Sequence, residues 1–127
     1  MPDEITLTLP ADEAFHPVAH LVLGGLAARL DVTIEHLEDL GLAVDSLLER
    51  APGRDVTLLV RVLDGELRTL VGPFVSIRAE LNQEAGDALD LRRILGTVCD
   101  KVEIVDRDGG EWVELTTRVD HVNGGAK

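Results

Sequence analysis

Aromatic residues are almost absent from this chain of 127 residues, which contains two Phe, one Trp and no Tyr. Because 45% of the residues are nevertheless hydrophobic, the core has to be built from Leu, Val, Ile and Ala. The length fits one domain of ordinary size. We therefore predict a single domain over residues 1–120, followed by a short flexible tail over residues 121–127.

Cysteine is equally scarce, since Cys99 is the only one. A single thiol cannot form an internal disulfide, which fits a reducing compartment. Residues Met1 to Glu4 are acidic and polar and lack the basic and apolar regions of a signal peptide. No apolar run is long enough to span a bilayer. We therefore expect a cytoplasmic protein that does not insert into membranes.

Positive charge is also in short supply, because 12 Lys and Arg stand against 24 Asp and Glu, for a formal net charge of -12. A surface of this kind repels phosphate backbones, so we expect no direct nucleic-acid partner. It suits both simple solubility and the binding of a basic protein partner, and composition alone does not choose between these two interpretations.

Hydrophobic periodicity predicts the elements of the N-terminal half. Residues 5–9 alternate between apolar and polar side chains, which predicts a strand that ends at Pro10. Apolar residues then recur at helical spacing over residues 15–30 and again over residues 34–51. Thr33 is a suitable N-cap for the second of these helices.

A hairpin follows over residues 56–71, where two alternating segments flank the turn signal Asp64-Gly65. Gly72-Pro73 is expected to interrupt the second strand of this hairpin. The next residues, 74–81, either extend the sheet or begin a loop. Residues 82–87 are polar and typical of a turn.

The C-terminal third has one more helix and a closing hairpin. Apolar residues at helical spacing over 91–102 predict the helix, and the strands flank the turn Asp108-Gly109-Gly110. Consecutive hairpins make a sheet mostly antiparallel, and such a sheet is covered economically on one face. We therefore predict an α/β (α+β) two-layer sandwich, a mostly antiparallel mixed sheet covered on one face by about three helices.

Residues 14–51 resemble the first two helices of bacterial anti-sigma-factor serine kinases, a branch of the histidine-kinase-like (GHKL) ATPases. The resemblance is carried by Ala-Arg-Leu-Asp-Val-Thr at 28–33 and Ile-Glu-His-Leu-Glu-Asp-Leu-Gly-Leu-Ala-Val-Asp at 34–45. Residues 99–104 also resemble the family's closing helix-to-strand junction, and the order of elements agrees. The resemblance implies the histidine-kinase-like ATPase fold, here with a reduced ATP lid.

The same resemblance implies a degenerate nucleotide site. The family uses a glutamate, an asparagine that holds Mg²⁺, an aspartate that binds adenine, and glycines that approach the phosphates. Those positions hold Ser46, Arg50, Gly72, Asp87 and Asp90 in this sequence. Arg50 would place a cation where Mg²⁺ should lie, and the two aspartates would repel phosphates. We therefore expect no catalytic residue, no cofactor and no metal.

A shift of one residue along the second helix gives an alternative. Asp45 and Glu49 are four residues apart and so lie on one face of the helix. Two carboxylates could hold Mg²⁺ or act as acid and base. The alternative is therefore a divergent serine kinase that still binds ATP and Mg²⁺, whereas the simpler interpretation is a solvated acidic helix face.

The first helix carries protein contacts in the resembling family. In this sequence the region contains His16, His20, Gly24, Gly25 and Arg29, which are the candidate partner-binding residues. Glycines remove side-chain bulk, so another backbone can approach closely. The pair Gly24-Gly25 could equally serve to fit the helix against its own sheet.

The leading hypothesis is a non-catalytic regulatory protein of bacterial transcription that binds proteins in a partner-switching system. By resemblance, the partner is a sigma factor or an anti-sigma-factor antagonist, and subunits pair as a homodimer. One alternative is the divergent ATP-binding kinase. The other is an α/β interaction domain with a partner that the sequence does not identify.

Overall fold

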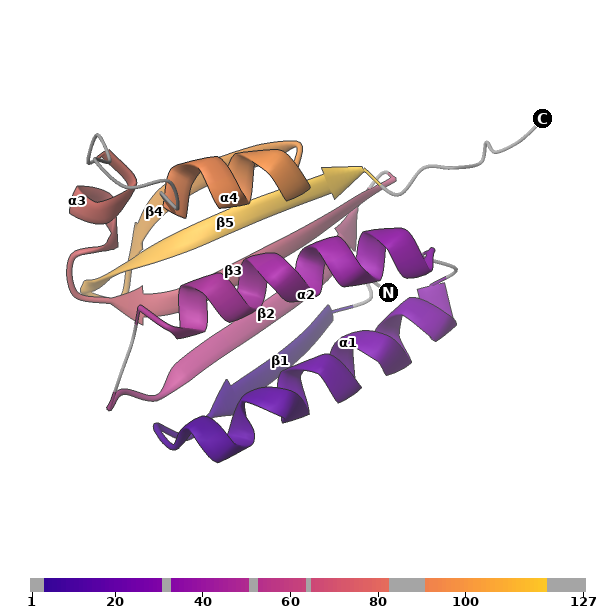
Figure 1. The fold of residues 1–127 in the computed structure, drawn as a ribbon, viewed down its shortest axis with the longest axis horizontal. Coiled ribbons are helices and arrows are strands. Elements are labelled where there is room, and N and C mark those ends of the chain that lie inside the picture. Colours follow the sequence, from indigo (N-terminus) through magenta and orange to yellow (C-terminus); the bar gives the residue numbers. More distant parts are fainter. Residues whose placement is uncertain (1–3, 31–32, 51–52, 64, 83–90, 119–127) are drawn as a thin grey trace.

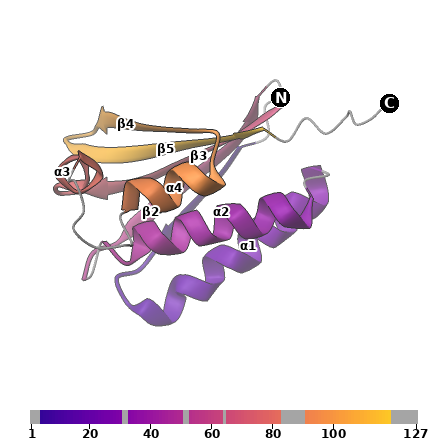
Figure 2. The same cartoon turned by 45° about the horizontal axis from the view of Figure 1, so that its top comes forward.

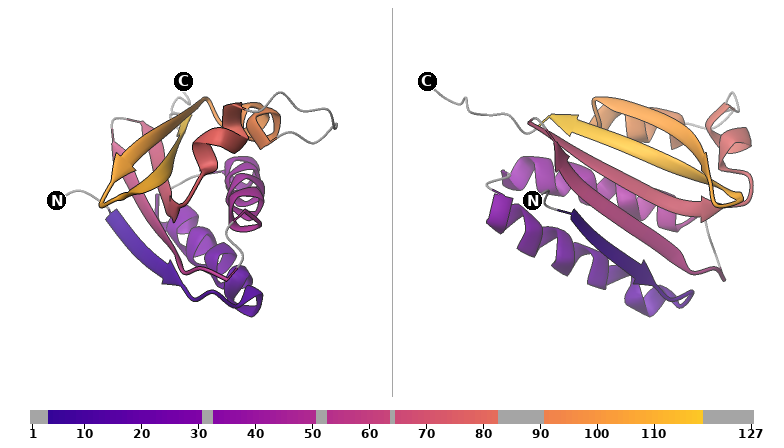
Figure 3. Two further views of the ribbon diagram at one scale, coloured as in Figure 1. Left: turned by 90° about the vertical axis from the view of Figure 1, so that its left-hand side faces the viewer. Right: turned by 180° about the vertical axis from the view of Figure 1, so that it is seen from behind.

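The computed structural model describes residues 4–30, 33–50, 53–63, 65–82 and 91–118. The chain folds into a two-layer α+β sandwich, in which a five-stranded sheet carries the helices on one face (Figures 1 and 2). This confirms the fold class that the periodicity predicts. The turned views in Figure 3 show the same layering, with all helices on one side of the sheet.

The sheet contains β1 (Glu4–Leu9), β2 (Val56–Leu63), β3 (Glu66–Phe74), β4 (Lys101–Arg107) and β5 (Gly110–Arg118). Its strand order is β1-β2-β3-β5-β4, and every neighbouring pair is antiparallel. The expected hairpins are β2–β3 and β4–β5. In their turns Gly65, Asp108 and Gly109 have positive φ angles, a conformation that glycine and aspartate tolerate better than most residues.

The helical layer consists of α1 (His16–Leu30), α2 (Ile34–Leu48), α3 (Ile77–Asn82) and α4 (Leu91–Val98), and a 3-10 turn (Glu13–Phe15) precedes α1. α2 lies in the middle of this layer, with α1 on one side and α4 on the other (Figure 1). α1 also contacts β1. The three long helices therefore cross the sheet in the order α1, α2, α4.

α2 begins where the sequence predicts. Thr33 has an extended backbone, and its Oγ1 accepts a hydrogen bond from the backbone N–H of His36 at 3.2 Å. This is the N-cap geometry that satisfies one of the free donors at a helix start. The helix then buries one stripe, and its fully or nearly fully buried members are Leu40, Ala43, Val44, Leu47 and Leu48.

The two faces of the sheet differ as strand alternation requires. The register places Leu58, Val71 and Val113 side by side on the face under the helices, and all three are buried. The opposite face mixes charged and apolar side chains: Arg68 pairs with Glu66 at 3.0 Å, and Leu70 and Trp112 are buried on the same face. One face of the sheet is therefore the floor of an aliphatic core.

The expectations for the middle of the chain are met only in part. Gly72-Pro73 disturbs the pairing without ending the strand: the register between β3 and β5 shifts between Val71 and Phe74, and β3 continues through a cis peptide bond to Phe74. After Phe74 the chain leaves the sheet, and residues 77–82 form the short helix α3. There are thus four α-helices among the described residues. Of the predicted turn at 82–87, Asn82 belongs to α3 instead, and the remaining residues lie outside the described part of the chain, as does the predicted tail at 121–127.

Replacing Val44 with Asp is expected to unfold the protein. Val44 is fully buried between α2 and the sheet, so the change would place an unpaired carboxylate in the aliphatic core. The expected loss is about 4 kcal/mol or more of the free energy of unfolding, measured by urea denaturation. Leu42→Asp on the exposed face of the same helix is the matched control and should leave the urea midpoint nearly unchanged. Equal loss in both variants would contradict the placement of α2.

Candidate functional site

α1 has apolar residues or glycines on most of its circumference, and only His16, His20 and Arg29 interrupt its sequence His-Pro-Val-Ala-His-Leu-Val-Leu-Gly-Gly-Leu-Ala-Ala-Arg-Leu with polar side chains. Ala19 and Leu23 are buried against the rest of the domain. On the other side Leu21 is 75% exposed. A helix that is apolar on all sides normally has contacts on all sides. The outer side of α1 is therefore the most conspicuous uncovered surface of the helical layer.

The glycine pair of α1 faces open space. A Cβ atom added at Gly24 or at Gly25 would meet no other atom within 4 Å. The described part of the structure therefore shows no close contact that requires a glycine at either position. Each glycine in a helix interior lowers the stability of the helix by about 1 kcal/mol relative to alanine. No contact within the described chain explains why glycine stands at these two positions.

His20 has a defined role between the two helices. Its Nε2 lies 2.9 Å from Oδ1 of Asp45, and both side chains are about half exposed. Gly41 makes room for the imidazole ring, because an added Cβ at this position would lie 2.9 Å from Cε1 of His20. Leu42, which follows Gly41 in α2, is 52% exposed.

We call the surface formed by Leu21, Gly24, Gly25 and Leu42 the α1 surface. Of the candidate partner-binding residues, Gly24 and Gly25 are part of it and His20 lies beside it, engaged with Asp45. His16 and Arg29 are the first residue and the next-to-last residue of α1, but their side chains lie outside the described part of the structure. Sequence reasoning missed Leu21 and Leu42, because single apolar residues on a helix do not reveal which side is covered.

Ser46 and Arg50, at two of the predicted nucleotide-site positions, contact near neighbours within or just after α2. Ser46 is buried, and its Oγ donates a hydrogen bond to the carbonyl oxygen of Leu42 at 2.9 Å. Arg50 follows the C-terminus of α2, and its Nη1 lies 3.6 Å from Oε1 of Glu49. Asp87 and Asp90 lie outside the described residues.

Gly72 has a clear packing role. An added Cβ at this position would lie 2.6 Å from Cδ2 of Trp112, so the indole ring covers the glycine. The indole Nε1–H donates to the carbonyl oxygen of Arg107 at 3.1 Å, and the guanidinium of Arg107 stacks 5.5 Å from the ring centroid. Gly72 is thus required by the close approach of Trp112 from the neighbouring strand.

The two carboxylates of the alternative pair in α2 have different neighbours. Asp45 contacts His20 of α1, whereas Glu49 is largely exposed and lies beside Arg50. Within the described ranges, no group of three or more His, Cys, Asp or Glu side chains could hold a metal ion. Burial raises the pKa of the Cys99 thiol to about 11, so this thiol is protonated near neutral pH.

The strand order and the helical layer on one face of the sheet define a two-layer α+β sandwich. The fold is similar to that in the crystal structure of the RsbU and RsbW domains of Rv1364c from Mycobacterium tuberculosis, with a TM-score of 0.67 and 14% sequence identity. The match covers 92% of this chain and 32% of that chain, so this chain spans about a third of its length. At this identity, the similarity shows the fold alone.

No family model matches the chain, and no curated protein matches it. None of the described helices is long and apolar enough to cross a membrane.

Gly72→Ala is expected to destabilise the domain by about 1–3 kcal/mol, because the new methyl group would collide with the indole of Trp112. Urea denaturation measures the change. The matched control is Gly96→Ala in α4, where an added Cβ meets no atom within 4 Å and helix propensity should raise stability by about 1 kcal/mol. If Gly72→Ala were as stable as the native protein, Trp112 would have to lie elsewhere.

Proposed function

We propose that this chain is a non-catalytic regulatory protein that binds a sigma factor or an anti-sigma-factor antagonist in a partner-switching system. The observation that carries the proposal is the uncovered α1 surface on a fold similar to a structure containing an RsbW domain. Such partners would place the protein in the cytoplasm. The sequence resemblance to anti-sigma-factor serine kinases points in the same direction.

The chemistry of the α1 surface favours a helix as the bound element. Leu21 and Leu42 offer apolar side chains, and Gly24 and Gly25 leave space for close approach. An amphipathic helix recognises a surface of this kind through its apolar face. Removal of the exposed leucines from water would supply the stabilisation.

Charge favours a basic partner over a second copy of this chain. The exposed face of α2 next to Leu42 carries Glu35, Glu38 and Glu49, which form an acidic stripe at helical spacing. Two copies meeting through this region would bring acidic stripes together, whereas basic side chains beside the apolar face of a partner helix would pair with them. We therefore rank a basic partner helix above the homodimer.

We further propose that the protein does not use ATP. Ser46 and Arg50 stand where the resembling family has its glutamate and asparagine, and Gly72 is covered by Trp112. Asp45 and Glu49 would have to leave their present neighbours to hold Mg²⁺ together. The alternative of a divergent ATP-binding kinase makes the opposite prediction for nucleotide binding.

Mg-ATP at low millimolar concentration is expected to leave the melting temperature unchanged and to give no heat of binding in calorimetry. A ligand present at 100 times its dissociation constant would stabilise the protein by about 2.7 kcal/mol, which is easily measured. If a thermal shift appeared in the native protein and disappeared in Glu49→Gln, the divergent-kinase alternative would be correct. Glu49 is largely exposed, so this control variant should fold normally.

Gly25→Leu is expected to abolish association with the partner and to leave the monomer at least as stable as before. The added side chain fills open space on the α1 surface, and leucine is a better helix former than glycine by about 1 kcal/mol. Co-purification from the native host with mass spectrometry identifies the partner, and titration with that purified partner measures affinity.

Thr97→Leu is the matched control, because it adds similar bulk to an exposed position of a different helix, α4. A partner that binds Gly25→Leu and the native protein equally well would show that the α1 surface is not the binding site. A lower melting temperature of Gly25→Leu would show instead that the glycine serves the domain's own packing.

A further inference from the structure

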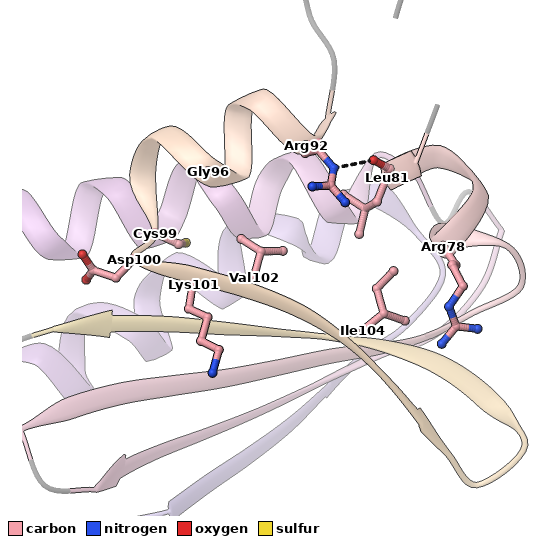
Figure 4. A pocket seen from close by; sticks show the side chains of 9 residues that line it. All are labelled: Arg78, Leu81, Arg92, Gly96, Cys99, Asp100, Lys101, Val102 and Ile104. Atoms are coloured by element: carbon pink, nitrogen blue, oxygen red, sulfur yellow. Dashed lines mark hydrogen bonds between the residues drawn. The ribbon is translucent and has the colours of Figure 1, made fainter. Parts of the chain in front are cut away.

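A second uncovered feature lies at the opposite edge of the sheet. A cavity of about 410 Å³ opens between α3, α4 and β4. Val102 and Ile104 point from β4 towards the helices, and Leu81 of α3 and the sulfur of Cys99 complete an apolar lining (Figure 4). Val102 and Ile104 are only half buried although they belong to the helix-facing side of the sheet. The aliphatic core is therefore incompletely covered here.

β4 is the edge strand that borders this cavity. It pairs with β5 on one side, and no strand of the described ranges pairs with its other side. Its seven residues include no proline, and an unpaired row of backbone N–H and C=O groups is a ready template for another strand. Cavity and edge together offer side-chain pockets and backbone partners in the same place.

Gly96 keeps the entrance of the cavity wide. It lies within α4 and lines the cavity, and a Cβ added there would meet no atom within 4 Å. A glycine inside a helix makes the helix less stable than alanine would, and no close approach within the described chain requires this one. The missing side chain leaves space for a group from outside.

The charge at the cavity entrance is positive. α4 carries Arg92 and Arg93 and has no acidic residue. Nε of Arg92 donates to the carbonyl oxygen of Leu81 at 2.8 Å, which holds this arginine at the cavity. Arg78 also lines the cavity and pairs with Glu111 and Asp106. The charged residues that line the cavity are Arg78, Arg92, Lys101 and Asp100, so basic side chains outnumber acidic ones here, in a chain of net charge -12.

From these observations we propose that an extended segment of a partner protein pairs with β4 as a sixth strand and inserts alternate apolar side chains into the cavity. Addition of a strand to a sheet edge derives affinity from backbone hydrogen bonds and specificity from alternate side chains. The segment has two apolar residues separated by one residue, next to Val102 and Ile104, and acidic residues near its ends. This inference does not depend on the proposed function of the α1 surface.

Self-pairing over the full length of β4 is unfavourable for a second copy of this chain. In the antiparallel register centred on Ile104, which pairs all seven residues, Lys101 would face Arg107 and Val102 would face Asp106. Like charges opposite each other destabilise a strand pair, so the charge pattern favours a different chain along the full length of β4.

The probe is the acetylated and amidated peptide Glu-Thr-Thr-Leu-Lys-Val-Glu. In the antiparallel register it places Leu opposite Ile104, Val opposite Val102, and its terminal glutamates opposite Lys101 and Arg107. Titration into the full chain, followed by NMR, is expected to give saturable shifts concentrated in β4 and α4. Absence of saturable shifts up to millimolar peptide would overturn the proposal.

Backbone methylation distinguishes strand addition from simple side-chain binding. Successive amides of a strand point to opposite sides, so only one of two adjacent N–H groups can bond to β4. One peptide is N-methylated at Leu and a second at Lys. We expect one of them to bind like the parent peptide and the other to lose binding. Equal affinity of the two methylated peptides would overturn the proposal.

Gly96→Leu tests the cavity itself. The new side chain should fill the entrance and weaken peptide binding by about tenfold or more, while the melting temperature stays the same or rises. Thr97→Leu adds similar bulk one residue further along α4 at an exposed position outside the cavity lining, and should bind the peptide normally. Unchanged peptide affinity of Gly96→Leu would overturn the proposal.

Octanoate separates a strand site from a small-molecule site, because it has an apolar chain and a carboxylate but no backbone amides. Strand addition predicts that the peptide binds more tightly than octanoate. If octanoate caused saturable shifts at Val102 and Ile104 and the peptide did not, the cavity would be a site for small amphipathic anions and the proposal would be wrong.

Discussion

The burial of one side of α2 on the middle of the sheet determines how the rest of the molecule is arranged. The core has almost no aromatic side chains to fill space, so aliphatic residues such as Val44 and Leu47 must pack closely on Leu58, Val71 and Val113. α1 and α4 then contact the two sides of α2. Both outer helices are therefore positioned by α2 as well as by the strands below them.

This arrangement leaves each outer helix with one uncovered side, and the two sides differ in chemistry. α1 has apolar residues and glycines where a surface helix would have charged side chains. α4 is strongly amphipathic, with Arg92 and Arg93 outward and Leu91 and Leu95 buried. Apart from Gly96, the outer side of α4 has the charged side chains expected of a surface helix, whereas that of α1 does not, which is why α1 is the better candidate for a principal partner.

Local sequence patterns predicted most of the helices and strands, but they did not predict contacts between residues that are far apart in the sequence. Strand alternation, the Asp64-Gly65 and Asp108-Gly109 turn signals and the Thr33 cap each depend on neighbouring residues. α3 was missed because six residues make too few turns to show a period. The same limit applies at the candidate sites. The contact of His20 with Asp45 joins residues 25 apart, and only the neighbouring strand shows that Gly72 accommodates Trp112.

The α1 surface and the β4 cavity lie at opposite edges of one sheet, because α1 contacts β1 and the strand order ends in β4. α2 and the buried strands β2, β3 and β5 separate them. An occupant of one site would therefore not block the other, and two partners could be held on one domain.

Coupling between the sites would have to pass through α2, whose buried stripe resists small displacements because the aliphatic core is closely packed. A shift of α2 that pulled Asp45 away from His20 is the movement by which an occupied β4 cavity would alter the α1 surface.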